Sequence, residues 1–344
     1  MTSLERIYAV LQGTPPDRIP VVPIIGQAAA RLNGMTISAE LKSPETLADS
    51  RLACRERFQY DGIYISAETW VTAEAMGAPV QYAEDAPVQG TTPLLTDKQQ
   101  IDHLVPADPS CDGRLPLLVK AVEIAARRAH DQFAVIGNFD QSPFSLACAL
   151  RGINQVMLDV YDDPVFMEKL LDICTETVIR YAKAMAQVGA HILNTGDSPA
   201  MLLGPQKYQK FALPYQQQVF NELQSYGIPT TLHICGNTTQ LLEFMGRSHA
   251  HSLELDSAVD LLAARNRLPQ NITIIGNIDP VGILLYGRPQ DVTTSITNLT
   301  QHVSSRLGRF ILASGCTLAP ETPSENIQAM VAVVREVTVL FSSC

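Results

Sequence analysis

The chain has 344 residues, of which 46% are hydrophobic and 17% charged, and its formal net charge is −10. So large an apolar share can bury an extensive core, which excludes a disordered chain. An acidic balance repels phosphate backbones and anionic lipid headgroups, so we expect neither nucleic-acid binding nor attachment to a membrane.

The cysteines and the N-terminus indicate the compartment. Seven scattered cysteines, an odd number in a chain this long, do not form the pattern of a disulfide framework. The first residues include Glu5 and Arg6 and lack the apolar core of a signal peptide. No run approaches the ~20 apolar residues of a membrane span. We therefore expect a cytoplasmic protein with reduced cysteines, which are Cys54, Cys111, Cys148, Cys174, Cys235, Cys316 and Cys344.

Short apolar runs rich in β-branched residues recur along the whole chain. Most are apolar at successive positions, which is typical of parallel strands covered on both faces. Eight such runs predict strands at 18–25, 61–66, 133–139, 190–196, 229–235, 251–256, 271–279 and 309–316.

Helical patterns separate these runs, most clearly at 163–189 and 323–341. Eight strands alternating with helices predict a (β/α)8 barrel, an α/β fold also known as a TIM barrel. A doubly wound open sheet is the alternative, but the first run is not followed by a GxGxxG phosphate loop. We expect one domain over residues 1–344, with an N-terminal helix at 2–13.

The interval after the second predicted strand, residues 67–132, is longer than one crossover helix requires. Its middle is rich in proline, glycine and other turn residues. We interpret 67–112 as an insertion of irregular loops and a hairpin at the barrel mouth rather than as a second domain.

The segment Thr231-Leu232-His233-Ile234-Cys235-Gly236 carries the most informative pattern. Side chains two apart on a strand point to the same face, so His233 and Cys235 share one. Both lie at the C-terminal end of a predicted strand, where barrels hold their catalytic residues. Imidazole and thiolate together provide half of a zinc site. A hydrogen-bonded core histidine beside a small buried cysteine is the alternative interpretation.

Cys316 favours the metal interpretation. It ends the last predicted strand, and barrel closure brings that strand end to the same mouth as His233 and Cys235. Three protein ligands leave the fourth tetrahedral position open, as a catalytic zinc ion requires. A structural zinc would need four ligands, often in CxxC pairs, and the sequence has no CxxC.

Other polar residues follow the predicted strands. Asp197, Glu254 and Asn277 are candidates for binding substrate at the mouth or for supporting His233. Helix capping is an equally good explanation for several residues at strand ends.

These motifs resemble the uroporphyrinogen decarboxylase superfamily, and within it the zinc-dependent corrinoid methyltransferases of the methylcobamide:coenzyme M type. The resemblance extends along nearly the whole chain. Its most specific segments are HICGNTTQLL, GNIDP and ASGCTLAPETPSENIQAMV.

The resemblance implies a (β/α)8 barrel in which His233, Cys235 and Cys316 bind Zn²⁺. It also implies methyl transfer from a methyl-Co(III) corrinoid, carried by a partner protein, to a small thiol such as coenzyme M through a zinc-bound thiolate. The sulfonate of coenzyme M requires a cationic or amide-rich pocket, for which Arg151 and Arg288 are the candidates.

Three alternatives remain at this point. The first is decarboxylation of a porphyrinogen, although the stretch at 24–31 lacks the arginine cluster of the decarboxylases. The second is another methyl acceptor, such as tetrahydrofolate or homocysteine. The third is a barrel that only binds a corrinoid, although no DxHxxG loop is present.

Overall fold

The computed structural model describes residues 1–341, with the side chains of 301–307 and 336–341 left undescribed, so Cys344 lies outside the described residues. Within 1–341 the main sheet has seven strands, and every neighbouring pair is parallel. The predicted barrel class is confirmed. In spatial order the strands are β1 (Gly62–Ile65), β4 (Ala134–Gln141), β5 (Ile192–Gly196), β6 (Thr230–Ile234), β7 (Ser252–Leu255), β8 (Thr273–Ile278) and β9 (Phe310–Ser314).

The prediction of a full strand at 18–25 was wrong. That segment forms only an isolated parallel bridge between Val21 and Leu312 of β9. On its other side the carbonyl of Val21 accepts from the backbone N–H of Asp61, just before β1. The segment thus occupies the eighth position of the barrel. Pro20 and Pro23 flank the bridge and have no N–H to donate, which keeps the pairing short.

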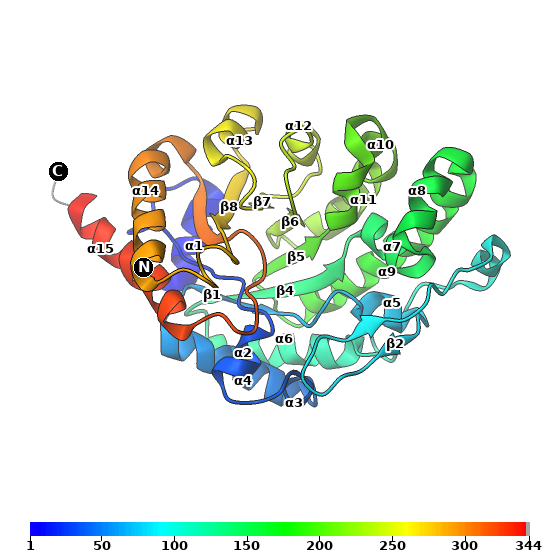
Figure 1. The fold of residues 1–344 in the computed structure, drawn as a ribbon, viewed down its shortest axis with the longest axis horizontal. Helices are drawn as coiled ribbons and strands as arrows, with labels where there is room; N and C mark the ends of the chain where they lie inside the picture. Colours follow the sequence, from blue (N-terminus) through cyan, green and yellow to red (C-terminus); the bar gives the residue numbers. More distant parts are fainter. Residues whose placement is uncertain (342–344) are drawn as a thin grey trace.

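The helices lie around the curved sheet (Figure 1). The predicted helices at 163–189 and 323–341 correspond to α9 (Pro164–Gln187) and α15 (Ser324–Phe341). The other helices of the crossovers are α4 (Pro44–Phe58), α6 (Leu115–Ala129), α7 (Pro143–Arg151), α8 (Ile153–Asp162), α10 (Gly204–Phe211), α11 (Leu213–Gln224), α12 (Leu242–Met245), α13 (Leu261–Arg267) and α14 (Pro289–Leu307).

The N-terminal helix α1 (Ser3–Gln12) fills the lower end of the barrel, which is the end at which the strands begin. Ile7 and Val10 of this helix are buried and cluster with Ile136 and Ile311, which point inward from the strands. A capping box at Thr2 and Glu5 fixes the start of the helix. This apolar packing closes the lower end of the barrel, so polar side chains gather at the upper end, beyond the C-terminal ends of the strands.

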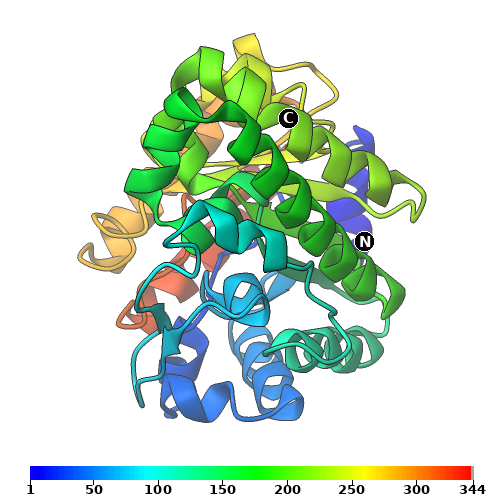
Figure 2. The same cartoon turned by 90° about the vertical axis from the view of Figure 1, so that its right-hand side faces the viewer.

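Residues 67–112 form short elements beside that upper end. They comprise α5 (Val71–Ala75), the two-residue antiparallel strands β2 (Val80–Gln81) and β3 (Gln89–Gly90), and a 3₁₀ helix at Lys98–His103. Figure 2 shows this part in cyan, between the blue N-terminal helices and the green helices. None of the helices in the described part of the chain is both long and apolar enough to cross a bilayer.

Candidate metal centre

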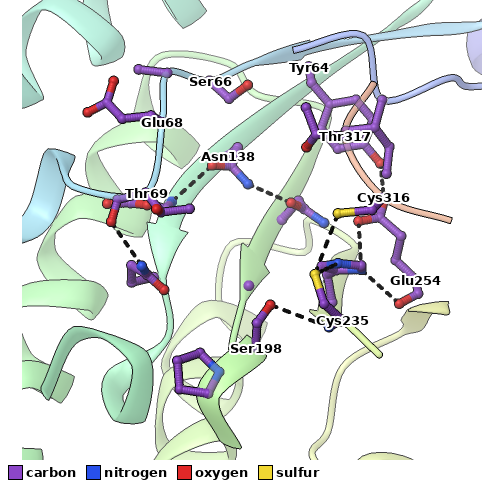
Figure 3. A pocket seen from close by; sticks show the side chains of 18 residues that line it. Tyr64, Ser66, Glu68, Thr69, Asn138, Ser198, Cys235, Glu254, Cys316 and Thr317 are labelled. Carbon is purple, nitrogen blue, oxygen red and sulfur yellow. Dashed lines mark hydrogen bonds and ion pairs between the residues drawn. The ribbon is translucent and has the colours of Figure 1, made fainter. Parts of the chain in front are cut away.

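Three metal-binding side chains converge at the upper end of the barrel. His233 lies on β6, Cys235 follows that strand directly, and Cys316 lies two residues beyond β9. Nε2 of His233 is 2.9 Å from Sγ of Cys235, which in turn is 3.5 Å from Sγ of Cys316. All three donor atoms lie within 4.8 Å of one another. Figure 3 shows the two sulfurs facing each other beside Glu254.

A backbone contact orients the imidazole of His233. Its Nδ1 lies 3.1 Å from the carbonyl oxygen of Glu254 on the neighbouring strand β7, so Nδ1–H donates there. The carboxylate of Glu254 lies 3.5 Å from the same nitrogen and accepts a hydrogen bond from the hydroxyl of Tyr64. With Nδ1 occupied, Nε2 is directed at the cysteines. This is the arrangement that fixes the tautomer of metal-binding histidines.

Close backbone packing sets the positions of the two cysteines. The N–H of Cys235 donates to Oγ of Ser198, and Gly236, at φ +83°, donates its N–H to Asp256. Gly315, directly before Cys316, lies so near Ser257 that an added Cβ would be 2.5 Å from its backbone nitrogen. Such a close approach is possible only for glycine.

The charges of the cluster favour a thiolate. The hydrogen bond with Cys316 lowers the pKa of Cys235 to about 4, and His233 assists. The same contact, together with burial, raises the pKa of Cys316. Burial opposes protonation of His233, but its contact with Cys235 and the charge of Glu254 raise its pKa to about 9. The contact between the two sulfurs therefore favours one thiolate in the pair, which is a ligand suited to a soft divalent metal.

The cluster forms one wall of a pocket of about 310 Å³. That volume lies at the lower end of the range for small-molecule sites, so it suits a small substrate better than a tetrapyrrole. The residues that line it are Ile24, Tyr64, Ser66, Ala67, Glu68, Thr69, Asn138, Asp140, Gln141, Asn194, Gly196, Ser198, Pro199, His233, Cys235, Glu254, Cys316 and Thr317.

Of the three residues predicted to bind substrate, the structure places only Glu254 in this lining. Asp197 is fully buried outside it, and its carboxylate accepts from Ser145 and Gln216. Asn277 donates to the carbonyls of Asp256 and Val259 and holds the loop after β7. The expectation that Asp197 and Asn277 face the mouth is therefore not met. Position at a strand end predicted their height in the barrel but not their orientation.

Neither arginine candidate for an anionic group reaches the pocket. Arg151 is buried, where it pairs with Asp159 and donates to the carbonyl of Leu95. Arg288 is exposed and pairs with Asp291 at the start of α14. Both guanidinium groups pair with carboxylates outside the pocket, and neither lines it.

Sequence reasoning missed several lining residues. Tyr64 on β1 and Ser66, which directly follows that strand, are one such pair. Asn138 and Asp140, two apart on β4, are another. The same rule that selected His233 and Cys235, polar side chains two apart where a strand ends, would have found Asn138 and Asp140.

The comparisons with known proteins agree with this architecture. A family model described as uroporphyrinogen decarboxylase (URO-D) matches residues 2–337. The chain belongs to the URO-D family. This membership confirms the resemblance inferred from the motifs around His233 and Cys316.

Similarity within the URO-D family extends to two named activities. The chain is 31% identical to the methylcobamide:CoM methyltransferase MtbA of Methanosarcina mazei, and the match covers 96% of both chains. It is 29% identical to the uroporphyrinogen decarboxylase of Nostoc punctiforme over 85% of this chain and 83% of that one. A solved methyltransferase from Methanosarcina mazei superimposes with a TM-score of 0.87 at 25% identity, covering 98% of this chain and 99% of the other.

Proposed function

We propose that this URO-D family protein is a methyltransferase that moves a methyl group from a methyl-Co(III) corrinoid to a small thiol, and that His233, Cys235 and Cys316 hold a zinc ion for this reaction. The observation that carries the proposal is the convergence of these three donor atoms within 4.8 Å at the mouth of the barrel. The names of the MtbA relatives support the same reaction class.

The donor set fits zinc. One imidazole nitrogen and two sulfurs are ligands typical of catalytic zinc, which keeps its fourth position open. Tetrahedral zinc holds neighbouring donors about 3.5–3.8 Å apart, given bonds of about 2.0–2.3 Å. The Sγ–Sγ distance of 3.5 Å is close to that spacing. When bound, the ion would lower the pKa of a substrate thiol and keep its sulfur nucleophilic at neutral pH.

The chain's own residues prepare the site for that ion. The carbonyl of Glu254 orients His233, and Ser198 fixes the backbone of Cys235. The contacts among the three residues favour a thiolate, whereas the raised pKa values of His233 and Cys316 mean that each of these two must lose a proton when the metal binds. The pocket walls hold the thiol beside the three ligands and limit the access of water.

In the proposed transfer, a lone pair of the thiol sulfur forms the new C–S bond. The Co–C bond of the corrinoid breaks, and both of its electrons remain on cobalt, which becomes Co(I). The thiol proton leaves to solvent. Because a pocket of about 310 Å³ is too small for a corrin ring, the corrinoid would approach from outside on a partner protein and present its methyl group at the mouth.

Porphyrinogen decarboxylation is the weaker candidate. A substrate with many carboxylates needs several cationic groups, and in the described part of the chain no Lys or Arg lines the pocket. Gly26 lies in the segment where the decarboxylases carry arginines. Its φ of +51° strains any larger residue, and a Cβ there would be 2.4 Å from the side chain of Thr317, which would have to shift.

Anaerobic incubation of zinc-loaded protein with methylcobalamin and a set of thiols tests the proposal. Loss of the methyl–cobalt absorbance, with the S-methyl product detected by mass spectrometry, is the expected result. Cys316→Ser should reduce the rate by at least about 100-fold, whereas Cys111→Ser, at an exposed cysteine, should not. Tetrahydrofolate serves as the alternative acceptor. If zinc-replete protein methylates no thiol, the proposal is wrong.

A further inference from the structure

A second hollow lies beside the pocket that contains His233, Cys235 and Cys316. It has a volume of about 320 Å³, and its lining shares Thr69 and Pro199 with the first pocket, as well as Gln141 at the end of β4. We call the first hollow the metal pocket and the second the side chamber. Because the same side chains line both, the two spaces adjoin at the mouth of the barrel.

The insertion after β1 forms one wall of the side chamber. Residues 91–93 of the insertion line it, and α7 and the start of α8 contribute another wall. Gly152, at φ +86° between these two helices, lies so near Pro93 that an added Cβ would be 3.1 Å from the proline ring. Arg151 donates from Nη1 to the carbonyl of Leu95 at 2.7 Å. These contacts hold the walls of the chamber in place.

The lining of the side chamber is neutral. None of the described residues that line it has a charged side chain, whereas three carboxyl groups line the metal pocket. Its apolar surface includes Trp70 and Ile153, and its polar groups are hydroxyls and the amide of Gln141. Such a lining suits an uncharged ligand that carries both apolar groups and amides. It offers no cation to a phosphate, a sulfonate or a carboxylate.

The side chamber is within reach of a corrin ring whose cobalt lies over the metal pocket. Oγ of Ser198 accepts from the backbone N–H of Cys235 at 3.3 Å, and Pro199 of the chamber wall is the next residue. Figure 3 shows Ser198 beside Cys235. Adding the intervening bonds puts the Cα atoms of Pro199 and Cys235 within about 11 Å of each other. A propionamide on the corrin rim extends seven bonds from cobalt, which is roughly 8 Å. The rim therefore reaches the chamber while the methyl group faces the cysteines.

We propose that the side chamber binds the carboxamide-bearing rim of the corrin ring and so orients the methyl donor over the metal pocket. The inference rests on the proposed methyl transfer and adds the site at which this chain itself contacts the corrinoid. The neutral lining matches the uncharged amides and methyl groups of the rim, and the metal pocket alone is too small for the ring.

Filling the chamber tests the proposal. Ala149, half-buried on α7, lines the side chamber and not the metal pocket. Ala149→Phe places an aromatic ring there, and Ala53→Phe, at an exposed alanine of α4, is the control. With zinc-loaded protein, we expect Ala149→Phe to raise the KM for methylcobalamin at least about tenfold. The zinc content and the KM for the thiol should stay within about twofold, because the metal pocket is unaltered.

Corrinoid binding is also measurable without turnover, because Trp70 is the only tryptophan of the chain and lies in the chamber wall. Methylcobalamin absorbs where tryptophan emits, so its binding quenches the fluorescence of Trp70. The dissociation constant from this quenching should be at least about tenfold higher for Ala149→Phe and within about twofold of the unaltered value for Ala53→Phe. Ala149→Leu, with a smaller added side chain, provides a second test if Ala149→Phe does not fold, with an expected rise of at least about threefold.

The outcomes separate the two proposals. An unchanged dissociation constant in every Ala149 variant that folds overturns the corrinoid site and leaves the methyltransferase proposal standing. A rise in the KM for the thiol alone also overturns the site, since the chamber would then hold the acceptor. If methylcobalamin binds with the expected difference between variants but no thiol is methylated, the proposed function fails and the corrinoid site stands.

Discussion

Sγ of Cys235 and Sγ of Cys316 lie 3.5 Å apart, although 81 positions separate the two residues in the chain. One follows β6 and the other follows β9, so two strands of the sheet, β7 and β8, lie between them. Only the curvature of the barrel brings the two strand ends within reach of one atom. This contact is the basis of the proposed metal site.

Removing one sulfur should remove the metal. We expect purified protein to contain about one zinc ion per chain, and Cys316→Ser to contain less than about a tenth as much, because two remaining ligands hold zinc weakly. Plasma emission spectrometry after dialysis measures the content. Cys111→Ser is the matched control, at an exposed cysteine away from the cluster. Full zinc in Cys316→Ser would remove that residue from the ligand set.

The loop before Cys316 should be as sensitive as the ligand itself. Gly315→Ala introduces a Cβ 2.5 Å from the backbone nitrogen of Ser257, so the loop that carries Cys316 must shift. We expect a zinc affinity about 10–100-fold lower while the circular dichroism spectrum is retained. Gly196→Ala is the control, because it lies in the same pocket with open space around its Cβ. Equal zinc affinity in the two variants would contradict this account.

Asp140 should make stability depend on pH. Its pKa is about 7 in the folded chain, against about 3.9 when unfolded, so the folded state retains the proton more tightly. The contribution of this group to stability therefore falls as pH rises from about 4 to about 7. The cost of its charge is fully present above that window.

Asp140→Asn removes the charge and keeps an oxygen to accept from Thr72. The variant should gain stability relative to the unaltered protein as pH rises from 5 to 8, by at most about 2.6 kcal/mol. Urea unfolding at the two pH values measures the difference. The same stability difference at both values would show that Asp140 is not perturbed.

Replacing Arg151 should lower the stability of the protein and leave binding of the thiol acceptor unchanged. It is buried, with Nε 2.9 Å from Asp159 and Nη1 2.7 Å from the carbonyl of Leu95. Arg151→Met leaves the buried carboxylate of Asp159 with Gln155 and the exposed Lys98 as its remaining side-chain partners in the described part of the chain, so we expect a loss of about 3 kcal/mol of unfolding free energy. The KM for the thiol should remain within about twofold. A large rise in KM with unchanged stability would restore Arg151 as a substrate ligand.

The sequence alone was sufficient for the barrel class and for the three candidate ligands. Both depend on local periodicity: apolar runs of strand length recur between helical patterns, and side chains two apart on a strand share a face. His233 and Cys235 are such a pair, and the short turn after β9 identified Cys316 as a strand-end residue. These patterns require no knowledge of contacts between distant segments.

Tertiary structure decided which strand-end residues face the pocket. Asp197 and Glu254 look alike in sequence, yet Asp197 is turned toward Ser145 and Gln216 behind the wall, while Glu254 reaches Tyr64 inside it. The orientation of each side chain depends on partners from other elements, which no local pattern encodes. The same packing decides which charged groups line the pocket. Arg114 pairs with Glu68, which lies 46 positions earlier in the chain, and Glu68 lines the pocket whereas Arg114 does not.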